Sequence, residues 1–150
     1  MTEYISHIIS LFYPYDKNHL SNINLISKII IKGSFQELLF YKNFHLETLL
    51  PQIEILLKAP HHILIHIFNN CTDISILNKV FFVHYLCAKQ IFSVELFDCL
   101  IQKGVYLDEL DPDNFEPIHY ACSCGSYEMI DYLISRKAAR ASMMNLFEFI

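Results

Sequence analysis

The chain has 150 residues, which is long enough to bury the core of one domain or of a short solenoid. Hydrophobic residues make up 53% of it and charged residues only 18%, so we expect some apolar surface to be covered by a partner or by further sequence. The net charge is −5 and the Lys and Arg residues are scattered, which excludes the basic patch that nucleic-acid-binding proteins need.

Neither a membrane span nor a signal peptide is expected. The longest charge-free stretches, such as residues 59–72, fall short of the roughly 18–20 apolar residues that a span requires. The N-terminus lacks the basic region and the small-residue cleavage site of a signal peptide. The cysteines are odd in number and do not follow the spacing of a disulfide scaffold: Cys71, Cys87, Cys99, Cys122 and Cys124. These features predict a cytoplasmic protein in a reducing compartment.

Helical periodicity dominates the first part of the chain. Apolar residues recur at helical spacing in several segments: residues 4–12, 19–31, 35–41, 46–58, 63–68 and 73–88. Gly33 is placed to end the second segment, Ser34 to cap the third, and Pro51 to break or kink the fourth. The chain has only three glycines, no Asn-Gly or Asp-Gly turn and no clear strand alternation. The predicted fold class is therefore all-α.

Residues 111–138 carry the most informative pattern, two short amphipathic helices with clear start and stop signals. Pro117 suits the first turn of a helix, and Gly125 can end that helix in a left-handed turn. One face of this helix is apolar and small, with Ile118, Ala121 and Cys122. The second helix has apolar residues at helical spacing: Met129, Ile130, Leu133 and Ile134.

This stretch resembles one ankyrin repeat, whose usual form is D-x-x-G-x-T-P-L-H-x-A-A-x-x-G-x-x-x-I-V-x-x-L-L-x-x-G-A. Seven residues fall in register with that form: Asp111, Pro117, His119, Ala121, Gly125, Leu133 and Ala138. Three positions depart from it. Glu116 replaces the Thr, so the family's hydroxyl–histidine bond is not expected in its usual form. Asn114 replaces a Gly that needs positive φ, which Asn tolerates, and Lys137 replaces the closing Gly, which should weaken that helix end.

An internal repeat precedes this one. Residues 83–88 echo residues 118–123, and residues 98–104 echo residues 131–137, once two extra residues are allowed near residues 90–92. Repeats of this kind are stable only against neighbours, so flanking helices should cover them. The predicted organisation has four parts: an irregular helical region packed on the repeats (1–81), a degenerate ankyrin-like repeat (82–110), an ankyrin repeat (111–138) and a C-terminal capping helix or truncated next repeat (139–150).

Candidate chemistry is sparse. His61, His62 and His66 lie near Cys71, but neither a C-x-x-C nor an H-E-x-x-H pattern accompanies them, so no metal site is predicted. Phosphate-cradling glycine loops are absent, and no cofactor is predicted. Nor is catalysis predicted, since no nucleophile stands beside a base and an orienting acid in the sequence.

The resemblance itself assigns roles to several of these residues. His84 and His119 occupy the ankyrin histidine position, whose role is to hydrogen-bond within and between loops. Cys122 occupies a small buried position of the repeat, and Cys124 is expected to face outward.

The resemblance implies a non-catalytic module that mediates protein–protein interaction through loop tips and the concave helix face. Carried over by position, that face comprises Asp113, Asn114, Phe115, Tyr120, Ser123, Cys124 and, in the degenerate repeat, Tyr85. The acidic residues around the loop, from Asp108 to Glu116, are either solvated or part of a contact patch. The alternative function is that of a structural or truncated segment of a larger or self-associating ankyrin array without a partner of its own.

Overall fold

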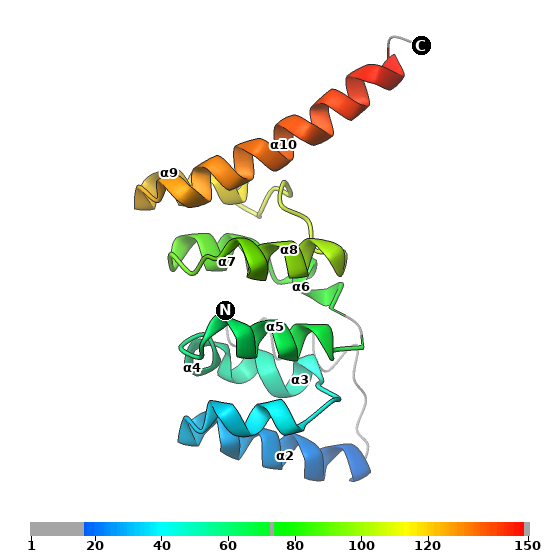
Figure 1. Ribbon diagram of the computed structural model, residues 1–150, viewed down its shortest axis with the longest axis vertical. Coiled ribbons are helices and arrows are strands. Elements are labelled where there is room, and N and C mark those ends of the chain that lie inside the picture. The colour runs from blue at the N-terminus through cyan, green and yellow to red at the C-terminus, as the bar shows by residue number, and fades with distance from the viewer. Residues whose placement is uncertain (1–16, 73, 149–150) are drawn as a thin grey trace. The chain divides into compact units, whose positions relative to one another are not determined.

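The computed structural model describes residues 17–72 and 74–148, and these residues are predominantly helical (Figure 1). Its elements, in chain order, are α2 (Lys17–Lys32), η1 (Phe35–Phe40), α3 (Leu46–Leu49), η2 (Leu50–Gln52), α4 (Ile53–Leu56), α5 (His61–Asn69), α6 (Ile76–Lys79), α7 (Phe82–Ala88), α8 (Val94–Gln102), α9 (Pro117–Cys124) and α10 (Tyr127–Glu148). Within these ranges there is no β-strand, and a single parallel bridge joins Phe44 and Cys71. The predicted all-α class is confirmed, while the predicted helix at residues 4–12 lies outside the described residues.

The chain divides into two compact units, Met1–Ile76 and Leu77–Ile150. In the first unit, α2 packs against η1, α3 and α4, and α5 packs on η1. Its core is formed by buried aliphatic and aromatic side chains, including Ile30, Leu38, Phe44, Leu56 and Phe68. None of the helices that the structure describes is both long and apolar enough to cross a membrane.

Two of the three helix signals predicted for the first unit, Gly33 and Pro51, act as predicted. Gly33, at φ 80°, ends α2 in the left-handed conformation that glycine adopts without strain. The segment 46–58 is broken at Pro51, which lies in η2 between α3 and α4. Ser34 precedes η1, but its side chain makes no capping hydrogen bond, so that part of the prediction was wrong.

The segment 73–88, predicted as one helix, forms two. Helix α6 ends at Lys79 and α7 begins at Phe82, because Phe81 adopts the left-handed conformation at φ 55°. Asn78 ties α6 to the chain after α8: its Nδ2 donates to the Gly104 carbonyl over 3.0 Å, and its Oδ1 accepts from the Tyr106 N–H over 2.8 Å. A non-glycine residue at positive φ is uncommon, and no local signal in the sequence marked this break.

The second unit consists of two successive helix pairs, α7 with α8 and α9 with α10. Helix α7 packs on α9, and α9 packs on α10. The Ser93 hydroxyl caps α8 by accepting from the Leu96 N–H over 3.2 Å. Aromatic rings join α8 to α10, since Phe97 and Tyr132 meet edge to face at 5.6 Å and Phe92 contacts both.

Helix α10 is one continuous element of 22 residues, Tyr127–Glu148 (Figure 1). The sequence predicted a weakened helix end at Lys137 and a separate C-terminal segment from residue 139. The structure instead continues the helix through both positions. At position 137, a glycine would have adopted the left-handed conformation that ends helices. A lysine is sterically disfavoured in that conformation and favours the helical one. Up to residue 148, the C-terminal segment is therefore an extension of the repeat's second helix.

Candidate interaction surface

The loop between α8 and α9, residues 103–116, is organised by the carboxylate of Asp111. Its Oδ1 accepts from the backbone N–H groups of Asp113, over 3.0 Å, and Phe115, over 2.9 Å. Its Oδ2 accepts from the hydroxyl of Tyr120 on α9. Asn114 adopts φ 65° as predicted for the position where the repeat has a glycine. One buried side chain thus fixes the turn and attaches it to the following helix.

These hydrogen bonds change the acidity of both partners. Burial alone would raise the pKa of Asp111, but the hydrogen bonds from Tyr120, Phe115 and Asp113 outweigh it, and the pKa is lowered. The bond to Asp111, together with burial and the negative charge of that carboxylate, raises the pKa of Tyr120 to about 12. At neutral pH, Asp111 is therefore ionised and Tyr120 protonated, which is the combination that the bond requires.

His84 holds the same loop from α7. Its Nε2 lies 2.8 Å from the Glu109 carbonyl oxygen and 3.0 Å from that of Phe115, and the side chain is buried. The predicted role of this histidine, bonding between a helix and the next loop, is confirmed. His119 acts more locally, since its Nδ1 accepts from the Glu116 N–H over 2.9 Å at the start of α9.

The two departures from the repeat pattern at Glu116 and Lys137 pair with each other. The Lys137 ammonium lies 2.9 Å from both carboxylate oxygens of Glu116. This ion pair joins the N-terminus of α9 to α10. Comparison of residues 111–138 with the usual repeat form identified both departures but could not show that the two side chains contact each other.

Phe115 is the centre of a small aromatic cluster on the loop. Its ring lies 6.0 Å from that of Tyr120 and 5.6 Å from that of His119, and Tyr120 in turn meets His84 at 5.9 Å. Phe115 nevertheless remains 46% exposed. Asp113, Asn114 and Ser123 are also exposed. We call the residues Asp113, Asn114, Phe115, Tyr120 and Ser123 the loop–α9 surface.

A family model described as ankyrin repeats (3 copies) matches residues 46–145. The chain belongs to the ankyrin-repeat family. The match begins in α3, upstream of the degenerate ankyrin repeat that the sequence analysis placed at residues 82–110. No solved structure matches the chain. Ankyrin repeats are generally protein–protein interaction modules, and the family is typically non-enzymatic.

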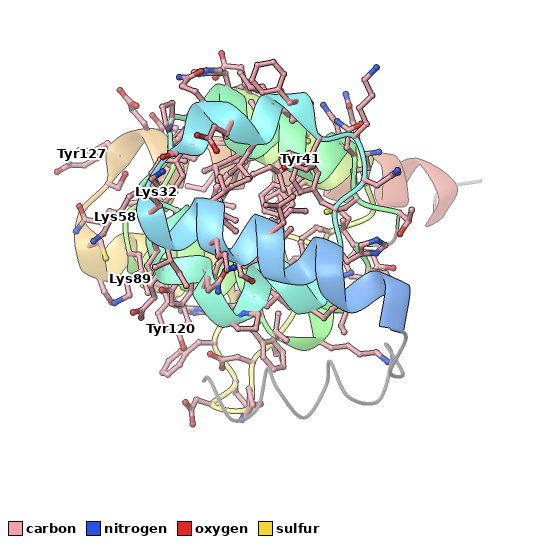
Figure 2. All side chains as sticks on the ribbon, turned by 90° about the horizontal axis from the view of Figure 1, so that it is seen from below. Lys32, Tyr41, Lys58, Lys89, Tyr120 and Tyr127 are labelled. Atoms are coloured by element: carbon pink, nitrogen blue, oxygen red, sulfur yellow. The ribbon has the colours of Figure 1, made fainter. Side chains whose placement is uncertain are left out.

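The remaining predicted ankyrin surface residues lie on helices and not on the loop: Tyr85 on α7 and Cys124 at the end of α9. Tyr85 is partly buried on α7, with the Lys89 ammonium 5.8 Å from its ring centroid. The Cys124 thiol points to the end of α7, with Sγ 3.5 Å from the Ala88 carbonyl oxygen. Figure 2 labels Tyr120 and Lys89, and also Tyr127, which projects into solvent with 81% of its surface exposed.

Sequence reasoning missed two large apolar side chains that the loop exposes, Tyr106 and Leu110. Neither lies in a helical or strand pattern, so periodicity gave no signal for them. It also missed the role of Asp111, which the repeat pattern identified only as a matching position.

The predicted burial of the two cysteines of α9 was wrong. Cys122 was expected to be buried, but it is exposed, and Cys124, expected to face outward, is partly buried. Ala121 is buried on the side of α9 that packs against α7 and α10. A residue one place further on lies about 100° around the helix axis. The exposed side of α9 therefore includes Cys122.

This arrangement predicts the order in which the thiols react. Burial, followed by the charge of Cys124, raises the pKa of Cys87 to about 12, so its reactive thiolate is scarce at pH 8. Cys122 is exposed and should react with a maleimide at least about tenfold faster than Cys87. Peptide mass spectrometry of the briefly labelled native protein measures the order, and equal labelling in urea is the control. Labelling of Cys87 before Cys122 would contradict the placement of α9.

The histidines of α5 do not converge on a metal site. Among the described residues, no group of three or more His, Cys, Asp or Glu side chains is placed to hold a metal ion. His66 has a structural contact instead, since its Nε2 lies 2.8 Å from the carbonyl oxygen of Tyr41.

Proposed function

We propose that this ankyrin-repeat protein acts in the cytoplasm as a non-catalytic module that binds another protein through the loop–α9 surface. The observation that carries the proposal is the half-exposed ring of Phe115 on a loop that Asp111 and His84 hold by hydrogen bonds. The proposed surface also includes the partly buried Tyr85 of α7 and Cys124 of α9, as the resemblance implies. A scaffolding role would follow from such binding.

The hydrogen bonds that hold the loop support the proposal. Asp111 fixes the turn from within, and His84 bonds two of its carbonyl groups. A loop that is ordered before binding loses little conformational entropy when a partner docks. The exposure of Phe115 therefore comes from a defined conformation, as expected of an anchor residue at an interface.

Removal of this anchor is expected to weaken partner binding. Phe115→Ala should lower affinity by about 5- to 30-fold, because truncation of an interface anchor costs about 1–2 kcal/mol. The measurement is capture from a lysate of the source cells, quantified by mass spectrometry. The matched control is Tyr127→Ala, which removes another exposed aromatic ring from the same unit. Tyr120→Ala is a poorer test, because it would also leave the Asp111 carboxylate without its hydroxyl partner.

The outcomes separate the two functions that the sequence left open. The proposal that the loop–α9 surface binds a partner is supported if the wild type and Tyr127→Ala retain the same proteins and Phe115→Ala loses them. Retention of the same proteins by Phe115→Ala would contradict it. Capture of nothing but further copies of the chain would favour the structural alternative, and light scattering across a range of concentrations would then show self-association.

A further inference from the structure

The second unit has a pocket that none of the loop–α9 surface residues lines. Its volume is about 260 Å³. Five aliphatic side chains supply its apolar lining: Ile101 of α8, Val105 and Leu107 of the loop, Ile118 of α9 and Leu133 of α10. We call it the α8–α10 pocket.

Charged side chains of the pocket are held in place by partners. Lys137 is bonded to Glu116, and both line the pocket. Arg136 donates to the Asp98 carboxylate over 2.7 Å, and its guanidinium lies 4.8 Å from the centroid of the Tyr132 ring. Because these two ion pairs are partly exposed, they orient the charged side chains at the edge of the pocket but contribute little to the stability of the fold. They leave an apolar interior with an ordered, charged edge.

The volume of the pocket limits what can occupy it. Sites for cofactors and drug-sized ligands usually measure about 300–1,000 Å³. The α8–α10 pocket is smaller, and its donors and acceptors belong to Tyr106 and to four charged side chains: Asp108, Glu116, Arg136 and Lys137. One bulky apolar side chain fits these properties, in the way that an anchor residue fills a pocket at the centre of a protein interface.

The charge around the pocket indicates which residues should flank that side chain in the partner protein. The loop, residues 103–116, contains one basic residue, Lys103, and five acidic residues: Asp108, Glu109, Asp111, Asp113 and Glu116. Lys137 and Arg136 are each already paired with a carboxylate. Among the groups that line the pocket or pair with its lining, the carboxylates of Asp98, Asp108 and Glu116 outnumber the two cations. The local electrostatic potential is therefore negative and complements a cationic partner. We propose that the α8–α10 pocket takes a bulky apolar side chain of a partner protein that is flanked by Lys or Arg.

This inference rests on the proposed protein-binding function and adds a second contact point with a stated chemistry. Three blocked pentapeptides test it on the full chain: a central Leu between two pairs of Lys, a central Ala between the same Lys pairs, and a central Leu between two pairs of Glu. The readout is the shift of the Ile118 and Leu133 amide signals in ¹H–¹⁵N NMR spectra. The Lys-flanked Leu peptide should shift them saturably. The Ala peptide should bind at least about tenfold more weakly, because it buries much less apolar surface in the pocket, and the Glu-flanked peptide should not bind.

A variant that fills the pocket provides the structural control. Ile118 is only partly buried, so Ile118→Trp should fold, occupy the pocket and abolish the Leu-dependent shifts. Tyr127→Trp adds the same indole outside the pocket and should bind as the wild type does. If circular dichroism shows that Ile118→Trp is unfolded, Ile101→Trp fills the pocket from α8 instead. Any of three results would overturn the inference. The Leu and Ala peptides could bind equally well, the Lys- and Glu-flanked peptides could bind equally well, or the filled variant could bind as the wild type does.

The same samples separate this inference from the proposed function. Phe115→Ala leaves the α8–α10 pocket intact and should bind the Lys-flanked Leu peptide normally. If the peptide does not bind but capture of a partner still depends on Phe115, the pocket inference alone is wrong. If the peptide binds and capture does not depend on Phe115, the loop–α9 proposal alone is wrong.

Discussion

Ala121→Glu is expected to abolish the cooperative folding of the second unit. Ala121 has 0% of its surface exposed, on the helix that packs against both α7 and α10. A glutamate there would clash with its neighbours and bury an unpaired charge, and such changes cost more than about 4 kcal/mol. That loss is comparable with the whole stability of a typical domain, about 5–15 kcal/mol. Urea denaturation followed by circular dichroism measures it.

The neighbouring residue offers a matched control. Cys122 lies on the same helix one residue further on, but it is exposed. Cys122→Glu introduces the same side chain and should change the free energy of unfolding by no more than about 0.5 kcal/mol. Equal destabilisation by both variants would show that helix propensity, and not burial at Ala121, decides the effect. Wild-type stability of Ala121→Glu would contradict the packing of α9.

Residues with restricted backbone preferences made much of the fold predictable. Gly33, Pro51, Pro117 and Gly125 end, break or begin helices where the sequence placed those events. Each acts through its own φ angle or its missing N–H, so the local sequence is sufficient to predict its effect. The positive φ of Asn114 was predictable for the same reason.

Features that depend on tertiary contacts were not predictable in this way. The break at Phe81 requires an unfavourable left-handed residue, which the surrounding structure must stabilise. The orientation of Cys122 and Cys124 depends on which side of α9 meets α7. The repeat pattern predicts that α9 is a helix. It predicts which side of that helix faces the neighbouring helices only to within one residue.

The candidate surface was predictable in outline. The resemblance pointed to the loop and to α9, and Phe115 is exposed there. It could not show that Glu116 and Lys137 meet, since they are 21 positions apart in sequence. Nor could it show that one carboxylate, Asp111, organises the whole loop, because that needs the distances to Asp113, Phe115 and Tyr120.

Asp111→Ala is expected to lower the free energy of unfolding of the second unit by about 3 kcal/mol. Asp111 is buried, and its carboxylate accepts from two backbone N–H groups and from the Tyr120 hydroxyl. Hydrogen bonds to a charged group contribute about 1.5–3 kcal/mol each, and partial hydration of the released donors limits the total. Urea denaturation at pH 7 measures the loss. Asp113→Ala is the matched control, since it removes an exposed carboxylate from the same turn and should cost no more than about 0.5 kcal/mol.

The lowered pKa of Asp111 adds a pH dependence with a definite sign. A carboxyl whose pKa is lower in the folded than in the unfolded state stabilises the fold only while it is ionised. Its contribution is therefore complete above the ordinary pKa of 3.8 and is lost as the pH falls through the lowered value. The wild type should lose its advantage over Asp111→Ala below about pH 4, whereas the difference should be constant between pH 6 and 8. A gap that persists unchanged at pH 2 would show that Asp111 acts through its shape and not through its charge.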